Sequence, residues 1–218
     1  MQEFLEALEK KLRLMFQSEA TGHDIFHLKR VTALALRIQE KEGGDQLVVA
    51  VSAFLHDIYR IIQKETGQYC TPKDSLPKVR AILTAAKMPG DKIPAILHCV
   101  EFHEEYTFSA DGKSASDIET LIVQDADNLD AMGAIGIARA FVYCGAKKIP
   151  IWLPEKPFDR ETFDESTDDV SEIHHFRSKL LRLKDNMNTK TAKQIARGRH
   201  KFMEHFLHEF FAEWEGKK

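Results

Sequence analysis

Two histidines and two aspartates in this chain form a set that could bind a divalent metal ion: His27, the adjacent pair His56 and Asp57, and Asp127. Imidazole and carboxylate groups are the ligands that borderline to hard divalent cations prefer in proteins. If the four side chains meet in the folded chain, the chemistry to expect is hydrolysis assisted by a metal ion. Whether they meet depends on the elements that carry them.

Apolar residues recur at helical spacing along most of the chain, whereas the alternation typical of strands is weak, so we expect an all-α fold. The expected helices cover about residues 2–17, 25–42, 46–57, 75–88, 91–103, 117–129, 132–144 and 172–216, with a break in the last near 186–189. The segments 117–129 and 132–144 could form one continuous helix. Polar loops are expected at about 63–73 and 107–116.

The chain has 218 residues, of which 43% are hydrophobic, and this is enough for one sizeable core. We expect a single domain over residues 1–218: a compact multi-helix bundle with its core at about 20–145, a loop at about 146–171 and a C-terminal helical extension at about 172–216. The loop is rich in proline and acidic residues, and it is a candidate lid.

Composition argues against several classes of protein. Lys and Arg total 31 against 34 for Asp and Glu, a net charge of −3, which gives no electrostatic case for a nucleic-acid partner. The three cysteines have no paired metal spacing and are interpreted as free thiols. No secretory signal is visible, and no apolar stretch approaches the roughly 18 residues needed to span a membrane. A cytoplasmic protein without a membrane partner is the simplest expectation.

The surroundings of the four candidate ligands decide how much weight they carry. Consecutive helical residues point about 100° apart, so His56 and Asp57 can reach one ion only near a helix end or from a cleft between helices. Asp127 lies between apolar residues, where a carboxylate without a partner is costly. Taken singly, such a histidine is more often a satisfied core residue, and such an aspartate a helix cap or an ion-pair partner. The ordered set, and no single member, therefore indicates a metal site.

The chain resembles the HD-domain superfamily of metal-dependent phosphohydrolases in the order of these residues and in the segments around them: GHDIFH at 22–27, FLHDI at 54–58 and DADNLDA at 125–131. It also resembles a small single-domain bacterial subgroup in GAIGIAR at 133–139 and in HHF at 174–176 with KLL at 179–181. The resemblance implies an all-helical HD-domain bundle and one divalent metal ion held by His27, His56, Asp57 and Asp127. It also implies hydrolysis of phosphoesters or phosphoanhydrides, with nucleotides as the commonest small-molecule substrates.

Four protein ligands of this kind leave positions on a six-coordinate metal ion for a water molecule and a substrate phosphate oxygen. The expected reaction is attack of a metal-activated water on phosphorus, with release of phosphate or pyrophosphate. Neutral imidazoles and carboxylates suit Mn, Fe, Co, Ni or Mg, and the sequence does not rank these metals.

Further polar residues are predicted to complete the site. The predicted catalytic residues are Asp57, Arg60, His103 and Asp130, and the predicted substrate-binding residues are His23, Arg60 and Arg139. The two arginines would neutralise phosphate charge. Asp130 would orient a ligand, because it lies three residues after Asp127 and can share its helix face.

Several of these residues also have a plainer interpretation. His23 could be a surface histidine, Arg60 could lie on a solvated helix end, and Asp24 is expected to cap the helix that carries His27. His98 lies five residues before His103, a poor match for one helix face, so a single metal ion is expected. The basic residues at 174–179 could form a second edge of the pocket, although a solvated helix face is the commoner outcome.

Two other functions stay open. A phosphodiesterase or signalling-nucleotide hydrolase fits the same superfamily, but the Gly-Tyr-Pro element of cyclic-dinucleotide enzymes is absent, and Arg60 stands where alarmone hydrolases have a carboxylate. The third alternative is a non-enzymatic metal- or nucleotide-binding sensor. A partner protein or, in a homodimer, a second copy of the chain would bind such a sensor along a C-terminal apolar stripe: Phe202, Phe206, Phe210, Phe211 and Trp214. More commonly, such a stripe docks onto the protein's own core. Base and sugar contacts are expected in loops at about 61–74 and 145–171.

Overall fold

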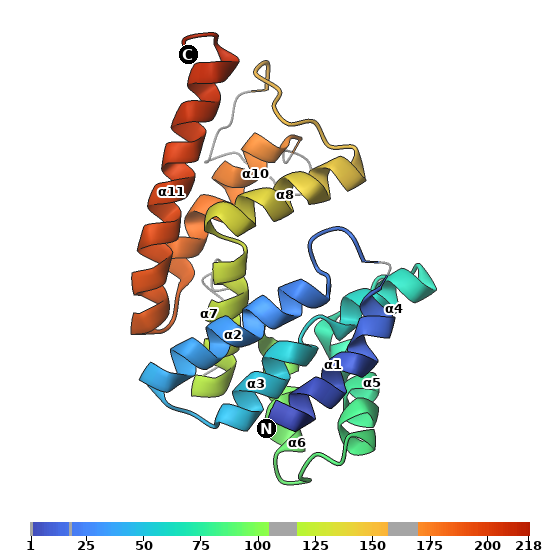
Figure 1. Cartoon of the computed structure of the whole chain (residues 1–218). Helices are drawn as coiled ribbons and strands as arrows, with labels where there is room; N and C mark the ends of the chain where they lie inside the picture. The colour runs from blue at the N-terminus through green and yellow to red at the C-terminus, as the bar shows by residue number, and fades with distance from the viewer. Residues whose placement is uncertain (1, 18, 105–116, 157–169) are drawn as a thin grey trace.

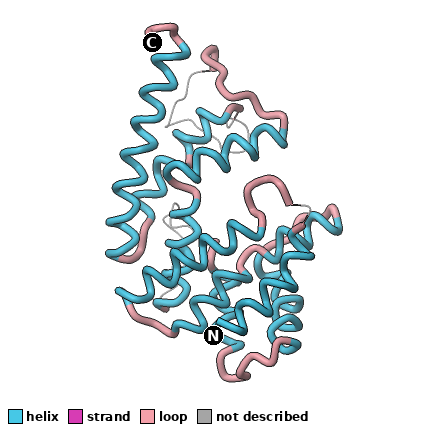
Figure 2. Tube along the Cα trace, viewed as in Figure 1, coloured by secondary structure: helices cyan, strands magenta, loops and turns pink. Residues whose placement is uncertain are grey.

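The computed structural model describes residues 2–17, 19–104, 117–156 and 170–218, and helices and loops make up this part of the chain (Figure 2). The absence of strands from these residues confirms the all-α prediction. The predicted turn at 107–116 and most of the candidate lid, residues 157–169, lie outside the described residues.

The helices follow one another along the chain as α1 (Gln2–Phe16), α2 (Ile25–Glu42), α3 (Gln46–Leu55), α4 (Ile58–Thr66), α5 (Pro72–Ala85), α6 (Ile93–Phe102), α7 (Ile118–Asp130), α8 (Gly133–Lys147), α10 (Glu172–Ser178), the 3-10 helix η1 (Leu180–Asn186) and α11 (Lys190–Trp214). Figure 1 shows α1 to α6 gathered in one part of the molecule and α8 and α10 in another, with α7 running between the two. The break predicted near 186–189 is the passage from η1 to α11.

Side-chain caps set the starts of the helices that position the candidate ligands. The Asp24 carboxylate accepts a hydrogen bond from the His27 backbone N–H at 2.9 Å, as predicted, and fixes the start of α2. Asp45 caps α3 and Asp117 caps α7 in the same way. Because each cap fixes where its helix begins, it also fixes which side chains face the interior.

The third predicted helix is two helices in the structure. α3 ends just before His56, and α4 begins just after Asp57, so the pair lies at a junction between helices. α4 then continues to residue 66, and the prediction of a loop from residue 63 is wrong. The helix persists because Ile61 is buried in the core, and it ends where Gly67 adopts a left-handed conformation with φ of +69°.

The start of α5 also differs from the prediction. The helix begins at Pro72 and not at Ser75, because Thr71 and Asp74 form a reciprocal capping box ahead of it. The Asp74 side chain accepts from the Thr71 backbone N–H at 2.9 Å, and the Thr71 hydroxyl accepts from the Asp74 N–H at 3.3 Å. Pro72 fits the first helical position, where no intrahelical donor is needed.

α7 and α8 are separate helices, bent by 71° relative to each other, so the alternative of one continuous helix is excluded. Gly133 turns the chain with φ of +72°, and a Cβ at Gly136 would lie 2.3 Å from the backbone of Ala131. These two glycines let α8 fold back closely against the end of α7. No single helix among the described residues is long and apolar enough to cross a membrane, although α7 and α8 together would be, by length and composition alone.

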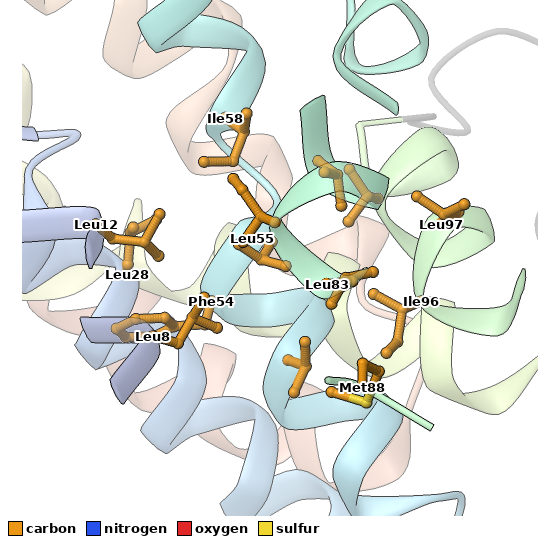
Figure 3. Packing of buried hydrophobic residues seen from close by; sticks show 14 of the residues in the cluster. Leu8, Leu12, Leu28, Phe54, Leu55, Ile58, Leu83, Met88, Ile96 and Leu97 are labelled. Carbon is orange, nitrogen blue, oxygen red and sulfur yellow. The ribbon is translucent and has the colours of Figure 1, made fainter. Parts of the chain in front are cut away.

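Two clusters of buried apolar side chains hold the helices together. The first joins α1, α3, α4, α5 and α6, and Figure 3 shows part of it, with Leu8, Leu55 and Ile96 among the labelled residues. The second joins α2, α3, α7, η1 and α11. α2 contributes to both, with Leu28 in the first cluster and Val31 in the second. Full burial of one such side chain contributes about 1.5–3 kcal/mol, so α2 and α3 are firmly held between the two clusters.

The apolar stripe of α11 divides between core and surface. Phe206, Phe210 and Phe211 are partly buried against the second cluster, which is the docking that the sequence favours. Phe202 and Trp214 are each 49% exposed. The homodimer seam stays a prediction.

Candidate metal centre

The two histidines of the predicted ligand set face each other. His27 lies in the first turn of α2, and His56 follows the last residue of α3. Their Nε2 atoms are 3.2 Å apart, and both side chains are fully buried. The packing of α2 against α3 thus brings together two residues that are distant in the sequence.

The other ring nitrogen of each histidine is already hydrogen-bonded. His56 Nδ1 lies 2.8 Å from the Ala53 carbonyl oxygen and donates to it, since a carbonyl oxygen only accepts. His27 Nδ1 lies 2.8 Å from Oδ2 of Asp130 and donates to that carboxylate. In the neutral imidazoles, both Nε2 atoms therefore carry a lone pair and no proton, which is the form that binds metal ions.

Two carboxylates border this pair of nitrogens. Asp57 Oδ2 lies 3.3 Å from His27 Nε2 and 3.6 Å from His56 Nε2. Asp127 Oδ1 lies 3.5 Å and 3.7 Å from the same two atoms. One ligand atom each of His27, His56 and Asp57 lies within 4.8 Å of the others, and Asp127 adjoins this group through both imidazoles. We call these four residues the ligand cluster.

The ligand cluster has the chemistry of a cation site. Two lone pairs 3.2 Å apart, buried and bordered by two carboxylates, repel one another unless a positive charge lies among them. Asp57 Oδ2 is buried and accepts no hydrogen bond. A shared proton can satisfy two of these atoms, whereas a divalent cation can satisfy all four. The donor set contains no thiolate, so it fits Mn, Fe, Co, Ni or Mg better than a structural zinc ion.

Neighbouring charges set the protonation of the cluster. Burial works against ionisation of Asp57, but the Arg60 guanidinium and the His56 imidazole hold the pKa of Asp57 well below its usual value. Burial likewise opposes ionisation of Asp127, and His56 and His27 lower its pKa. Burial lowers the pKa of His56. At neutral pH both carboxylates are therefore ionised and His56 is neutral, as metal binding requires.

Asp130 lies behind His27. Its Oδ2 accepts from His27 Nδ1 at 2.8 Å and from Arg139 at 2.9 Å, and its two oxygens accept from Arg30 at 2.8 and 3.0 Å. Despite burial, the hydrogen bonds from His27 and Arg30 hold the pKa of Asp130 far below its usual value. In return, burial lowers the pKa of His27, but the hydrogen bond to Asp130 and the nearby negative charge of Asp57 outweigh it, so the pKa of His27 is raised. A carboxylate in this place fixes the tautomer and orientation of the imidazole.

Arg60 lies between two carboxylates at the edge of the cluster. Its Nε donates to Asp57 Oδ1 at 2.8 Å, and its Nη2 donates to Glu104 Oε1 at 2.9 Å. The Tyr59 hydroxyl donates to the same Glu104 oxygen, and the guanidinium carbon lies 4.8 Å from the centre of the Tyr59 ring. The side chain of Arg60 is 36% exposed, so it is not the fully solvated helix end of the plainer interpretation.

The two histidines near the end of α6 have different environments. His103 is buried, its Nδ1 donates to the Val100 carbonyl at 2.8 Å, and its Nε2 has no hydrogen-bond partner. The centre of its ring lies 5.0 Å from that of His56. His98 is exposed and pairs with Asp117 at 3.0 Å. Of the two, His103 adjoins the ligand cluster and His98 lies at the surface.

A pocket of about 420 Å³ lies next to the ligand cluster. α8 lines it with five residues at the spacing of one helix face: Gly136, Arg139, Ala140, Tyr143 and Cys144. Its other walls come from the loop before α2, from α4, from the junction of α7 and α8, from the loop after α8 and from the segment around α10: Thr21, His23, Arg60, Ala131, Ile149, Ser171, Glu172, His175, Lys179 and Leu180. The volume lies within the range of about 300–1,000 Å³ that is typical of small-molecule sites.

Two of the predicted substrate-binding residues connect the pocket with the cluster. His23 lines the pocket, and its ring centre lies 5.5 Å from that of His27. Burial, together with the nearby Arg60 guanidinium, lowers the pKa of His23 to about 3, so this imidazole is neutral at neutral pH. Arg139 also lines the pocket and is held by its hydrogen bond to Asp130. The plainer interpretation of His23 as a surface residue does not apply.

The pocket wall formed by α8 and α10 is the part of the site that the sequence reveals least. No motif in the sequence marks Tyr143 or Glu172, although Tyr143 lies four residues after Arg139 and so shares its helix face. The segment 61–74, expected to carry substrate contacts, supplies none of the lining residues, although the structure describes all of it. Residues 61–66 belong to α4, which packs on α5, and residues 72–74 are the first turn of α5. His175 and Lys179 line the pocket, in line with the interpretation of residues 174–179 as a second edge.

Comparison with known proteins places this arrangement in a family. The model of the HD domain matches residues 25–132, a range that includes all four members of the ligand cluster. The chain is also similar to YpgQ of Bacillus subtilis (strain 168), an uncharacterized protein, with 35% identity over 205 residues. That similarity covers 93% of this chain and 89% of YpgQ.

Solved structures resemble the whole chain. A crystal structure of an HD-superfamily hydrolase from Bacillus thuringiensis is 33% identical, with 98% of each chain covered and a TM-score of 0.74. The crystal structure of Bacillus subtilis YpgQ in complex with ADP is 32% identical, with 94% of this chain and 97% of that chain covered and a TM-score of 0.68. The likeness therefore extends past residue 132 into α8, α10 and α11.

Proposed function

Because this chain belongs to the HD-domain family and has the fold of HD-superfamily hydrolases, we propose that it is a divalent-metal-dependent phosphohydrolase acting on a nucleotide. One observation carries the proposal. The Nε2 atoms of His27 and His56 lie 3.2 Å apart, bordered by two carboxylates and next to a pocket lined by cationic side chains. Such a site can hold a cation and present a phosphate group to it.

His27, His56, Asp57 and Asp127 would hold one metal ion. A divalent ion bound by such groups lowers the pKa of water and offsets negative charge on phosphate oxygens. The hydrogen bonds at the two Nδ1 atoms select the tautomer in which Nε2 of the neutral ring has its lone pair free for a metal ion. Asp130 contributes as a positioning residue, because it fixes the ring of His27 from behind.

Cationic side chains around the pocket would bind the phosphate groups of the substrate. Arg60 and Arg139 each donate to a carboxylate, Asp57 and Asp130 respectively, which holds the guanidinium groups in place. A guanidinium has five N–H donors, so each arginine keeps donors for a phosphate. Lys179 adds a further positive charge from another wall. Hydrogen bonds to charged groups contribute roughly 1.5–3 kcal/mol each.

His103 would hold a water molecule for the reaction. Its Nδ1 donates to the Val100 carbonyl, so Nε2 of the neutral ring has a lone pair, and this nitrogen is buried without a partner beside His56. A water molecule there can donate to Nε2 and pass a proton to it as the water oxygen attacks phosphorus.

The shape and chemistry of the pocket favour a nucleotide over a simple phosphate ester. The lining face of α8 spans residues 136–144, about 12 Å at 1.5 Å per residue. Arg60 and Arg139 join the pocket lining to Asp57 and Asp130, while Ala140 and Leu180 supply apolar surface and Tyr143 an aromatic ring that can stack on a base. The crystal structure of YpgQ with ADP supports nucleotides as the class of ligand.

Nucleotide hydrolysis by the purified protein tests the proposal. The protein is stripped of metal, reloaded separately with Mn, Fe, Co, Ni or Mg, and incubated with nucleoside mono-, di- and triphosphates while phosphate and pyrophosphate are measured. We expect release that requires metal and disappears in His56→Ala. His98→Ala is the matched control and should keep the wild-type rate, since His98 lies on the surface. No release above the His56→Ala background with any metal and nucleotide would contradict the proposal.

A further inference from the structure

The surroundings of Arg60 are those of a cation-binding site. The guanidinium bridges two carboxylates, with Nε 2.8 Å from Asp57 Oδ1 and Nη2 2.9 Å from Glu104 Oε1. The His103 imidazole lies between His56 and Tyr59, with its ring centre 5.0 Å and 6.1 Å from theirs, and its buried Nε2 has no partner. Two carboxylates and an imidazole are again the ligand types of a borderline to hard divalent cation. In this structure the positive charge among them belongs to Arg60.

The same kind of hydrogen bond orients the ring of His103 and the ring of His56 in the ligand cluster. Each histidine follows the last residue of a helix, and each donates from Nδ1 to the carbonyl oxygen three residues earlier, Val100 or Ala53, at 2.8 Å. This shared hydrogen bond turns each Nε2 away from its own helix. The two rings lie 5.0 Å apart at an interplanar angle of 74°. His56 Nε2 faces the cluster, while His103 Nε2 is left unsatisfied although the residue is only 1% exposed.

Arg60 is held in this position by its neighbours. The Tyr59 hydroxyl donates to the same Glu104 oxygen that accepts from Arg60. The guanidinium carbon lies 4.8 Å from the centre of the Tyr59 ring, and that ring lies 6.1 Å from the ring of His103. The guanidinium is therefore fixed between Asp57, Glu104 and Tyr59.

We propose that Arg60 takes the place of a second divalent cation, and that Asp57, Glu104 and His103 form a latent second metal site which the guanidinium keeps closed. This inference rests on the proposed function in one respect: it assumes that the ligand cluster binds the first metal ion. A guanidinium can donate hydrogen bonds to a phosphate but cannot activate water as a metal ion does. The wild-type protein would therefore hold a single metal ion, with a second positive charge that does not depend on the metal concentration.

Counting bound metal tests this inference without any substrate. Metal-free protein is titrated with Mn²⁺ by calorimetry, bound Mn is measured by elemental analysis, and electron paramagnetic resonance detects the magnetic coupling of two ions at the separation of about 3.5–4 Å found in two-metal sites. We expect one Mn per chain in the wild type and two coupled Mn in Arg60→Ala. Arg60→Lys keeps the positive charge and should bind one. The double variant Arg60→Ala/His103→Ala should also return to one.

The outcomes separate failure of this inference from failure of the proposed function. One Mn in both Arg60→Ala and Arg60→Gln, or two Mn in the wild type, would overturn the inference. Thermal melting shows whether each variant is folded, and Arg60→Gln carries the test if Arg60→Ala is not, because glutamine is neutral but keeps hydrogen-bonding capacity. Failure of the wild type to bind any Mn would contradict the proposed function as well. A wild type that binds one Mn and hydrolyses nucleotides, with no second ion in the neutral variants, would overturn the inference alone.

Discussion

The ligand cluster and the pocket wall of α8 and α10 lie side by side but are built differently. The side chains of His27, His56 and Asp57 are buried, and the helices around them start at side-chain caps and pack against two apolar clusters. The wall is one face of a helix together with a segment distant in sequence, and Tyr143 on it is 41% exposed. We therefore expect the chemistry to reside in the buried cluster and substrate selection in the more exposed wall. Variants in the two regions should therefore fail in different ways.

Loss of a cluster carboxylate should have the largest effect. Asp57→Asn keeps the size of the side chain but removes the charge that faces both imidazoles. We expect metal binding to be lost and hydrolysis to fall on the order of 10³-fold. Elemental analysis of the purified variant and its rate of phosphate or pyrophosphate release check this together. A variant that still binds metal and still hydrolyses nucleotides would contradict the claim that the ligand cluster is the metal site.

Loss of His103 should slow the reaction while the first metal ion stays bound. Removal of a general base typically lowers the rate by about 10²-fold or more, so His103→Ala should show this loss in kcat with near-normal Mn affinity. Rate measurements at saturating substrate and a parallel Mn titration check it. His98→Ala, the surface histidine of the same helix, is the control and should change neither quantity. Loss of the metal ion in His103→Ala would make His103 a ligand and not a base.

Loss of the carboxylate behind His27 should weaken metal binding without abolishing it. Mutation of such a partner typically costs about 10–100-fold in metal affinity or activity, and we expect this range for Asp130→Asn. A Mn titration of the metal-free variant measures the effect. If instead the variant changed only KM, Asp130 would belong to the pocket wall through Arg139 and not to the cluster through His27.

Changes in the pocket wall should have the smallest effect and should act on substrate binding. Loss of one charge-assisted contact in Lys179→Ala should raise KM about tenfold, with Mn affinity unchanged. Lys193→Ala, an exposed lysine on α11, is the matched control. Steady-state kinetics with the preferred nucleotide separate KM from kcat. A fall in kcat with constant KM would contradict the claim that the pocket wall binds substrate while the ligand cluster carries out the chemistry.

The ligand cluster could be predicted because its signals are local. Asp24 is a cap recognisable from sequence, the His56–Asp57 pair follows an apolar helix, and Asp127 stands in an apolar run that tolerates a carboxylate only with a partner. These signals mark the residues singly, and it is the resemblance to the HD-domain superfamily that implies their convergence on one metal ion.

The further site residues could be named from the sequence, but their partners and the pocket wall could not be predicted, because both depend on contacts between distant segments. Arg60 could be seen as a basic residue near the cluster, but its second partner, Glu104, follows α6 and is brought close only by the packing of the helices. The wall depends on the fold-back of α8, which requires the close approach of Gly136 to the backbone of Ala131. The periodicity of apolar residues predicts which face of a helix is apolar, but it does not predict which element packs against that face.

The central claim is that this cluster holds the metal ion on which hydrolysis depends, and one titration tests it most directly. Metal-free protein receives Mn²⁺ in steps, and bound Mn and released phosphate or pyrophosphate are measured in the same samples. The account predicts release that rises in proportion to bound Mn, levels off at one Mn per chain, and is absent from His56→Ala. Release that does not follow bound Mn, or a metal-loaded wild type no more active than His56→Ala, would contradict it.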